Sequence, residues 1–233
     1  MIEKKVLIVD DEPQLQRVLR PALKASGYEV LTAATGDDAL KAVAANALDL
    51  VILDLGLPDM DGKHTLRKIR VMSNLPVIVL SARDQEAEKI AALDLGADDY
   101  VEKPFSMGEL LARMRAALRH AQDDAGDIAR IESGGLSIDI GRRIVLKNGV
   151  VIRLTPKEFD LLAVLARHAG RLLSHREILR TVWGPAHQDD SQYLRVFVGQ
   201  LRAKIEDNAS APRFILTEPG VGYRFVADGD VAE

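Results

Sequence analysis

The first 121 residues alternate five times between a short apolar run and a segment whose apolar residues recur at helical spacing. Runs such as LVIL are typical of strands buried on both faces of a sheet. Strands that alternate with helices predict a parallel sheet, because a parallel connection needs a long crossover. We predict strands over residues 4–10, 28–34, 50–55, 76–82 and 99–103, and helices over 13–27, 37–48, the segment HTLRKIRVM, 85–96 and 107–121. This half is therefore expected to form an α/β domain with a doubly wound, five-stranded parallel sheet.

The second half has a different pattern, with short strand-like pieces followed by helical segments and a final hairpin. The strand-like pieces are RIES, LSIDI, RIVLKNG and VVIRL; the helices are predicted over 156–170, 175–184 and YLRVFVGQLRAKIED; the hairpin is RFILTEPGVGYRFVA. The polar, glycine-containing stretch QDDAGD between the halves is typical of a linker. We predict a first domain over 1–121, a linker over 122–127 and an α+β domain over 128–228.

The charge is distributed unevenly between the two halves. The 233-residue chain has a net charge of −4. Residues 1–121 carry 16 basic and 19 acidic side chains, a net of −3, whereas residues 128–227 carry 15 and 10, a net of +5. This asymmetry predicts different partners for the two domains, and the basic one suits nucleic acid.

Composition also excludes several classes of protein. The chain has no cysteine, which excludes disulfides, thiolate catalysis and Cys-ligated zinc. No apolar run approaches the ~20 residues that a membrane span needs, and no basic and then apolar leader opens the sequence. We therefore expect a cytoplasmic protein with no membrane partner.

Acidic residues follow two strands of the predicted parallel sheet, and a lysine follows a third. Asp10 and Asp11 follow the first strand, Asp54 ends the third, Ser81 ends the fourth and Lys103 follows the fifth. These ends meet at one rim, where crowded carboxylates repel unless a cation neutralises them. Mg²⁺ suits a few carboxylates and keeps waters for a phosphate. The pattern predicts Asp54 as a nucleophile towards phosphorus, although the run DDE alone would equally fit a helix start.

The blocks IVDDE, LDLGLPDMDG, VLSAR and GADDYVEKPF resemble, in order and spacing, the signature blocks of the two-component receiver domain. The resemblance covers residues 4–120 and implies that Asp54 accepts phosphate from a sensor histidine kinase. It implies that Asp11, Asp54 and the Gly56 carbonyl bind Mg²⁺, and that Asp10 helps through a water. It further implies that Lys103 contacts the phosphoryl group, after a Lys103–Pro104 bond that is cis in the family. The expected switch pair is Ser81 and Tyr100.

The helix YLRVFVGQLRAKIE has an apolar inward face and a basic and amide outward face with one glycine. Such a helix can approach a DNA groove closely, and the hairpin beside it favours this interpretation over an ordinary amphipathic surface helix. The predicted DNA-binding residues are Gln192, Arg195, Gly199, Gln200, Arg202, Lys204 and, on the hairpin, Arg224.

Residues 128–227 resemble the winged-helix output domain of the OmpR/PhoB subfamily, on the blocks LTPKEFDLLAVLARHAGRLLSHREIL, TVWG, YLRVFVGQLRAKIE and GVGYRF. Trp183 is expected in the core. Pro219 stands where many members have an arginine suited to a narrow minor groove, which argues against a strong contact from the wing tip.

The same resemblance implies that phosphorylated receivers pair through one face and bind direct-repeat promoter DNA as a homodimer. The expected interface residues are Lys89, Ile90, Leu93, Asp98, Asp99, Glu109 and Arg113, with Leu110 and Met114 as further apolar contacts. His120 stands where a basic residue is expected, which would make one ion pair weak or dependent on pH.

We expect a phosphorylation-switched transcription factor that is not an enzyme, and two other functions remain as alternatives. An aspartyl-phosphate phosphohydrolase of the haloacid dehalogenase type needs a second aspartate two positions after the nucleophile, where this chain has Gly56. A DNA-binding regulator that works without phosphorylation would not need the acidic cluster, yet the sequence alone leaves it open.

Overall fold

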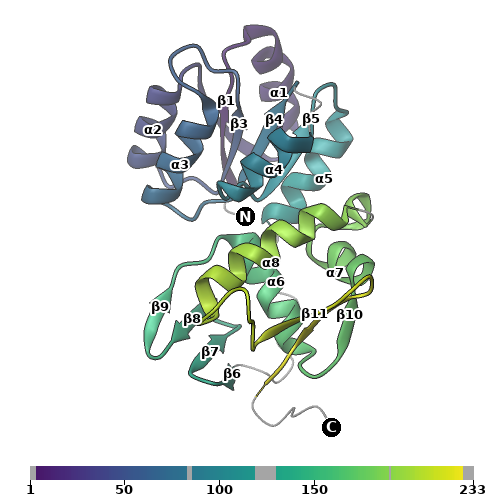
Figure 1. Ribbon diagram of the computed structural model, residues 1–233. Coiled ribbons are helices and arrows are strands. Elements are labelled where there is room, and N and C mark those ends of the chain that lie inside the picture. Colours follow the sequence, from purple (N-terminus) through teal and green to yellow (C-terminus); the bar gives the residue numbers. More distant parts are fainter. Residues whose placement is uncertain (1–3, 83–85, 119–129, 189, 228–233) are drawn as a thin grey trace. The chain divides into compact units, whose positions relative to one another are not determined.

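The computed structural model describes residues 4–82, 86–118, 130–188 and 190–227. The chain divides into two compact units, Met1–Leu118 and Arg119–Glu233, called here the N-terminal and C-terminal units (Figure 1). The predicted linker over 122–127 and His120 lie outside the described residues. Within the described residues, no helix combines the length and the apolar character needed to cross a bilayer.

The N-terminal unit contains the predicted parallel sheet, with strand order β2-β1-β3-β4-β5 and every pair parallel. Its strands are β1 (Lys4–Val9), β2 (Tyr28–Ala33), β3 (Leu50–Asp54), β4 (Val77–Ser81) and β5 (Asp99–Glu102), and its helices are α1 (Pro13–Ala25), α2 (Gly36–Ala45), α3 (Gly62–Met72), α4 (Glu86–Asp94) and α5 (Met107–Leu118). The predicted elements are all present, with ends shifted by a few residues.

Two layers of helices bury this sheet. The strand order reverses after β2, so right-handed crossovers put α1 on one face and α2, α3 and α4 on the other, while α5 contacts α1 (Figure 1). Every residue of β3 and β4 is buried, which explains why their sequences are apolar up to their last residues, Asp54 and Ser81. Rigid, fully covered strands thus support the residues at their carboxyl ends.

The C-terminal unit has a four-stranded antiparallel sheet, a three-helix core and a three-stranded sheet that ends in the hairpin (Figure 1). Its elements are β6 (Arg130–Ser133), β7 (Leu136–Asp139), β8 (Ile144–Lys147), β9 (Val150–Ile152), α6 (Pro156–Arg167), β10 (Leu172–Ser174), α7 (His175–Val182), η1 (Pro185–His187), α8 (Ser191–Ile205), β11 (Ile215–Glu218) and β12 (Gly222–Phe225). The sequence did not predict β10, which pairs only with β12.

Aromatic side chains fill the space between the helices of this unit. Trp183, 3% exposed, meets Tyr193 edge-on at 5.6 Å and Phe197 at 4.9 Å between ring centroids. Trp183 is therefore a core residue, as predicted. The apolar face of α8 (Leu194, Phe197, Val198, Leu201 and Ile205) is buried, which leaves the opposite face of this helix to the solvent.

Candidate phosphoacceptor site and nucleic-acid interface

The carboxyl ends of the parallel strands gather the predicted rim residues. Asp54 is the last residue of β3, while Asp10 follows β1 and Lys103 follows β5. Asp10 is fully buried and Asp54 is 7% exposed. The Lys103–Pro104 peptide bond is cis, as the resemblance implied.

Lys103 joins the two carboxylates. Its Nζ lies 2.8 Å from Asp54 Oδ1 and 3.0 Å from Asp10 Oδ2. A third carboxylate, that of Glu12, lies 3.5 Å from the same nitrogen. Glu12 was not among the predicted site residues, although its place in the run DDE is a signal for it. The rim is thus a cluster of carboxylates around one ammonium.

Burial and ion pairing have opposite effects on this cluster. Burial raises the pKa of Asp10 above its usual range, against the lowering effects of the Glu12 N–H and of Lys103. Burial would lower the pKa of Lys103, but its bonds to Asp54 and Asp10 outweigh it, so the Lys103 pKa is raised. The Lys103 Nζ lies within ion-pair distance of both carboxylates. Lys103 is therefore an ammonium at neutral pH.

The two oxygens of Asp54 have different partners. Oδ1 pairs with Lys103, whereas Oδ2 accepts a 2.6 Å hydrogen bond from the Gly56 N–H. Gly56 is exposed, at the start of the loop that follows β3. The Asp54 carboxylate is thus held from two sides in one orientation, at the carboxyl end of the central strand.

The donor set fits Mg²⁺ in part. Two buried carboxylates, Asp10 and Asp54, already share one cationic group, and the Asp11 side chain is exposed beside them. Oxygen donors of this kind are the ligands that Mg²⁺ prefers. However, no group of three or more His, Asp or Glu side chains gathers as a ready metal cage in the described part of the chain. The expected ligand set of Asp11, Asp54 and the Gly56 carbonyl, with Asp10 through a water, stays a prediction.

The predicted switch residues both lie inside the unit. Ser81 ends β4 and is 3% exposed, and Tyr100 in β5 is 5% exposed. In the sheet, Tyr100 pairs with Val79, two residues before Ser81. Both side chains are thus buried in this structure. Their role as a switch stays a prediction.

Part of the predicted dimer face is not on the surface. Leu93, Leu110 and Met114 have no exposed area, and the last two belong to the hydrophobic core. The prediction that they contact a second copy is therefore wrong for this conformation. Helical spacing marks an apolar face but does not say whether it turns inward or outward. Ile90 and Lys89 on α4 are partly exposed.

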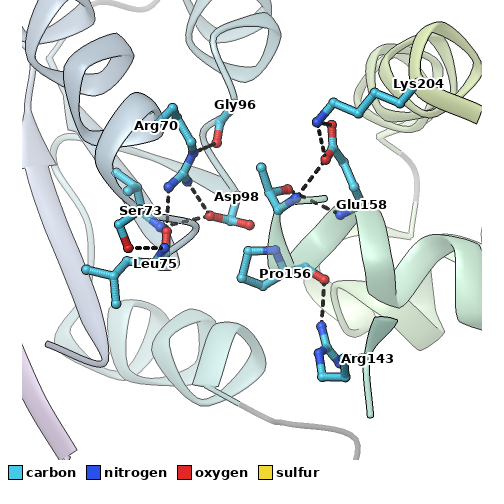
Figure 2. A network of polar contacts seen from close by, with 11 residues as sticks. Arg70, Ser73, Leu75, Gly96, Asp98, Arg143, Pro156, Glu158 and Lys204 are labelled. Carbon is cyan, nitrogen blue, oxygen red and sulfur yellow. Dashed lines mark hydrogen bonds and ion pairs between the residues drawn. The ribbon is translucent and has the colours of Figure 1, made fainter. Parts of the chain in front are cut away.

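Asp98 is also internal rather than interfacial. Its Oδ2 accepts from Arg70 Nη2 at 2.7 Å and from the Val77 N–H at 2.8 Å (Figure 2). The other guanidinium nitrogens of Arg70 donate to the Gly96 and Leu75 carbonyls. Asp98, with no exposed area, thus connects α3 to the starts of β4 and β5. This buried network corrects its assignment to the dimer face.

Asp99, Glu109 and Arg113 form a cluster within one chain. Arg113 Nη1 lies 3.1 Å from Asp99 Oδ1, and its Nη2 lies 2.7 Å from Glu109 Oε1. Asp99 and Arg113, both expected at the dimer face, are therefore already paired inside one chain. Pairing between copies would have to exchange these partners.

On the C-terminal unit, one part of α8 presents the expected DNA-reading surface. Gln192, Arg195 and Gly199 are exposed, and Arg195 Nη1 donates to Gln192 Oε1 at 3.3 Å. A Cβ added to Gly199 would meet nothing within 4 Å, so the helix is flat and open there. These three residues can meet a groove without disturbing the fold.

Arg202 is bound inside the unit. It donates to the Ile215 carbonyl at 3.1 and 2.6 Å and to Thr217 Oγ1 at 2.7 Å. These bonds hold β11 against α8, and the DNA contact of Arg202 stays a prediction.

Lys204 and Arg224 are also ion-paired within the unit. Lys204 Nζ lies 2.6 Å from both Glu158 oxygens (Figure 2), and its DNA contact stays a prediction. Arg224 pairs with Glu218 at 3.6 Å on the hairpin, and both are partly exposed. Gln200 is only partly exposed.

Two family descriptions match the chain, one on each unit. Residues 6–115 match "Response regulator receiver domain", and residues 149–225 match "Transcriptional regulatory protein, C terminal". The chain belongs to the two-component response regulators, with a receiver domain followed by a winged-helix DNA-binding domain of the OmpR/PhoB type.

Among curated relatives, "Transcriptional regulatory protein KdpE" of Mycobacterium tuberculosis is 50% identical over 224 residues, which are 95% of this chain and 99% of that protein. "KDP operon transcriptional regulatory protein KdpE" of Escherichia coli is 47% identical over 95% of this chain and 98% of its own length. Among solved structures, DrrB of Thermotoga maritima, described as an OmpR/PhoB homolog, is 31% identical over 97% of this chain and 100% of its own, with a TM-score of 0.53. A RitR mutant is 27% identical over 96% and 99%, with a TM-score of 0.77.

Proposed function

We propose that this response regulator is activated when Asp54 accepts a phosphoryl group from a sensor histidine kinase. The observation that carries the proposal is the Asp54 carboxylate at the strand end, with one oxygen on the Lys103 ammonium and the other on the Gly56 N–H. An aspartate held in this way is preorganised for in-line attack on phosphorus.

The residues divide the work of phosphoryl transfer. An Asp54 oxygen forms the new bond to phosphorus as the bond from phosphorus to the kinase imidazole breaks, and the imidazole leaves with the electron pair. The Lys103 ammonium then stabilises the negative charge on the oxygens of the transferred phosphoryl group. Asp11, Asp54 and the Gly56 carbonyl, with help from Asp10, would hold Mg²⁺, whose charge offsets that of the phosphoryl oxygens.

Labelling of the full chain with radioactive acetyl phosphate tests the acceptor. We expect Mg²⁺-dependent labelling of the wild type and none of Asp54→Asn, because the amide is not a nucleophile towards phosphorus. Asp37→Asn, an exposed residue of α2, is the matched control and should be labelled like the wild type. Labelling of Asp54→Asn at the wild-type level would remove Asp54 from the role.

We further propose that phosphorylated receivers pair through α4, β5 and α5, so that two output domains bind a direct repeat about one helical turn apart, ~10–10.5 base pairs. Arg195 and Gln192 would face base edges or phosphates, with Gly199 allowing close approach. Equal DNA affinity with and without a phosphodonor would instead favour a regulator that works without phosphorylation.

The relatives support a more specific proposal. The E. coli relative is named for the KDP operon, and the blocks LDLGLPDMDG and KIAALDLGADDYVEKPF of this chain look most like KdpE. We infer that the chain regulates a corresponding potassium-transport operon and receives phosphate from a KdpD-like kinase.

A further inference from the structure

Asp59 ties the loop that follows Asp54 to a neighbouring helix. Its Oδ1 accepts the Gly36 N–H at 2.8 Å and its Oδ2 accepts the Asp37 N–H at 3.0 Å. These are the first two residues of α2, whose N–H groups have no acceptor within the helix. The next free donor, the Asp38 N–H, is capped instead by Thr35 Oγ1 at 3.1 Å. The N–H groups at the start of α2 thus donate to two different acceptors: the neighbouring Thr35 and the Asp59 carboxylate from a loop distant in the sequence.

The two donors keep this carboxylate charged. They lower the pKa of Asp59 below its usual range, so that the side chain accepts from both N–H groups throughout the neutral range.

Close packing reinforces the tether. A Cβ added to Gly36 would lie 2.5 Å from Thr65 Oγ1 and 2.7 Å from Met60 Cγ, so α2 approaches α3 and the loop as closely as a glycine permits. At the far end of the loop, a Cβ on Gly62 would lie 2.5 Å from the Leu55 Cα. The loop over residues 55–61 is thus held at its middle by Asp59 and at its end by Gly62.

The loop in turn orients the phosphoacceptor. Gly56 lies in it and donates the 2.6 Å bond to Asp54 Oδ2. A Cβ on Gly56 would lie 3.0 Å from this oxygen, so the backbone sits directly against the carboxylate. A shift of the loop would therefore move the donor and release the Asp54 side chain.

We propose that Asp59 is a positioning residue for phosphorylation: by anchoring the loop to α2, it keeps the Gly56 N–H on Asp54 Oδ2 and leaves Oδ1 towards Lys103. The inference rests on the proposed role of Asp54 and adds the residue that sets its orientation. Small misplacements of a reacting group cost on the order of tenfold to a hundredfold in rate.

The test compares Asp59→Ala with Thr35→Ala in the full chain. Both variants remove a capping acceptor from the same end of α2, but only Asp59→Ala frees the loop. Two quantities are measured: the labelling rate with acetyl phosphate at saturating Mg²⁺, and the Gly56 amide resonance in a ¹H–¹⁵N NMR spectrum. Circular dichroism checks that both variants stay folded.

We expect Asp59→Ala to be labelled at least about tenfold more slowly and to lose the downfield shift that a short hydrogen bond gives the Gly56 amide. Thr35→Ala should resemble the wild type in both measurements. Asp59→Asn, with a single acceptor oxygen, should give an intermediate rate, which a purely structural role would not produce.

Equal slowing in Asp59→Ala and Thr35→Ala would overturn the inference, because the effect would then come from the stability of α2. A wild-type rate and an unchanged Gly56 resonance in Asp59→Ala would overturn it as well. If the wild type itself were not labelled, the proposed function would fail, while a Gly56 shift confined to Asp59→Ala would still support the tether.

Discussion

Arg195 and Arg202 lie on the same helix and would look equivalent in a charge pattern, but their surroundings differ. Arg195 is exposed and donates only to Gln192 among the bonds described above, whereas Arg202 donates to Ile215 and Thr217 of the hairpin. The first is free to meet DNA, and the second holds the fold. Helical spacing alone cannot separate the two, because the acceptors of Arg202 come from a strand that follows later in the chain.

Alanine variants should separate these roles. Arg202→Ala should lower the free energy of unfolding of the C-terminal unit by about 1.5–3 kcal/mol, the usual value of hydrogen bonds to a charged group. Arg195→Ala should leave stability unchanged and weaken DNA binding by ~1–3 kcal/mol. Urea denaturation followed by Trp183 fluorescence and a DNA titration measure the two effects. An Arg202→Ala variant that keeps its stability and loses DNA binding would show that Arg202 contacts DNA.

His175, the first residue of α7, should make the C-terminal unit sensitive to acid. Burial, and secondly Arg195, lower its pKa, so the folded unit takes up fewer protons than the unfolded chain. The stability that this shift contributes is complete above the unfolded value of ~6.5 and is lost as the pH falls through the folded pKa. The melting temperature, followed by Trp183 fluorescence, should fall between pH 7.5 and 5.5 and fall less in His175→Gln. The exposed His168→Gln variant controls for the loss of an imidazole, and an unchanged pH dependence in His175→Gln would contradict the expectation.

The Arg70–Asp98 network connects α3 to β4 and β5 through hydrogen bonds and an ion pair (Figure 2). Asp98→Asn keeps the shape but removes the charge opposite a guanidinium that is only 11% exposed. We expect a loss of about 3 kcal/mol in the free energy of unfolding of the N-terminal unit, since breaking a buried ion pair leaves one charge uncompensated. Circular dichroism during urea denaturation measures it.

The matched control for Asp98 is Asp94→Asn, an exposed residue on α4, which should be neutral. If Asp98→Asn had wild-type stability and impaired dimerisation, Asp98 would belong to the interface after all.

The elements were predicted well where one physical signal dominates. β3 and β4 are buried along their whole length, and their continuous apolar runs therefore indicated buried strands clearly. β10 has three residues and exists because it pairs with β12, a contact that no local pattern encodes. The rim of Asp10, Asp54 and Lys103 followed from parallel strand order, but the bonds of Asp59 to α2 did not, because they depend on how a loop folds back.

We propose that phosphorylation links the two units through dimerisation, and Glu109 is the residue at which this can be tested. It is 39% exposed and bound to Arg113, and we propose that it meets Lys89 of a second copy. Glu109→Lys should leave labelling of Asp54 intact and raise the dimer dissociation constant at least tenfold, ~1.4 kcal/mol, since like charges would face each other.

Sedimentation of the phosphorylated Glu109→Lys protein is the measurement, with the exposed Asp38→Lys variant on α2 as the control for charge reversal. A dimer fraction equal to that of the wild type would rule out this interface.

The parallel sheet of the N-terminal unit and the four-stranded antiparallel sheet of the C-terminal unit differ in the chain length that separates paired residues. In the N-terminal unit, β1 first meets a partner when Lys4 pairs with Tyr28, and its other neighbour begins at Leu50. In the C-terminal unit, Ser133 pairs with Leu136 and Lys147 with Val150, across tight turns. Hairpins close within microseconds, whereas parallel strands wait for long loops to close. The parallel sheet, which is synthesised first, is therefore the slower of these two sheets to form, and a nascent chain leaves the apolar strand β1 without its neighbour β3 until β3 has been made.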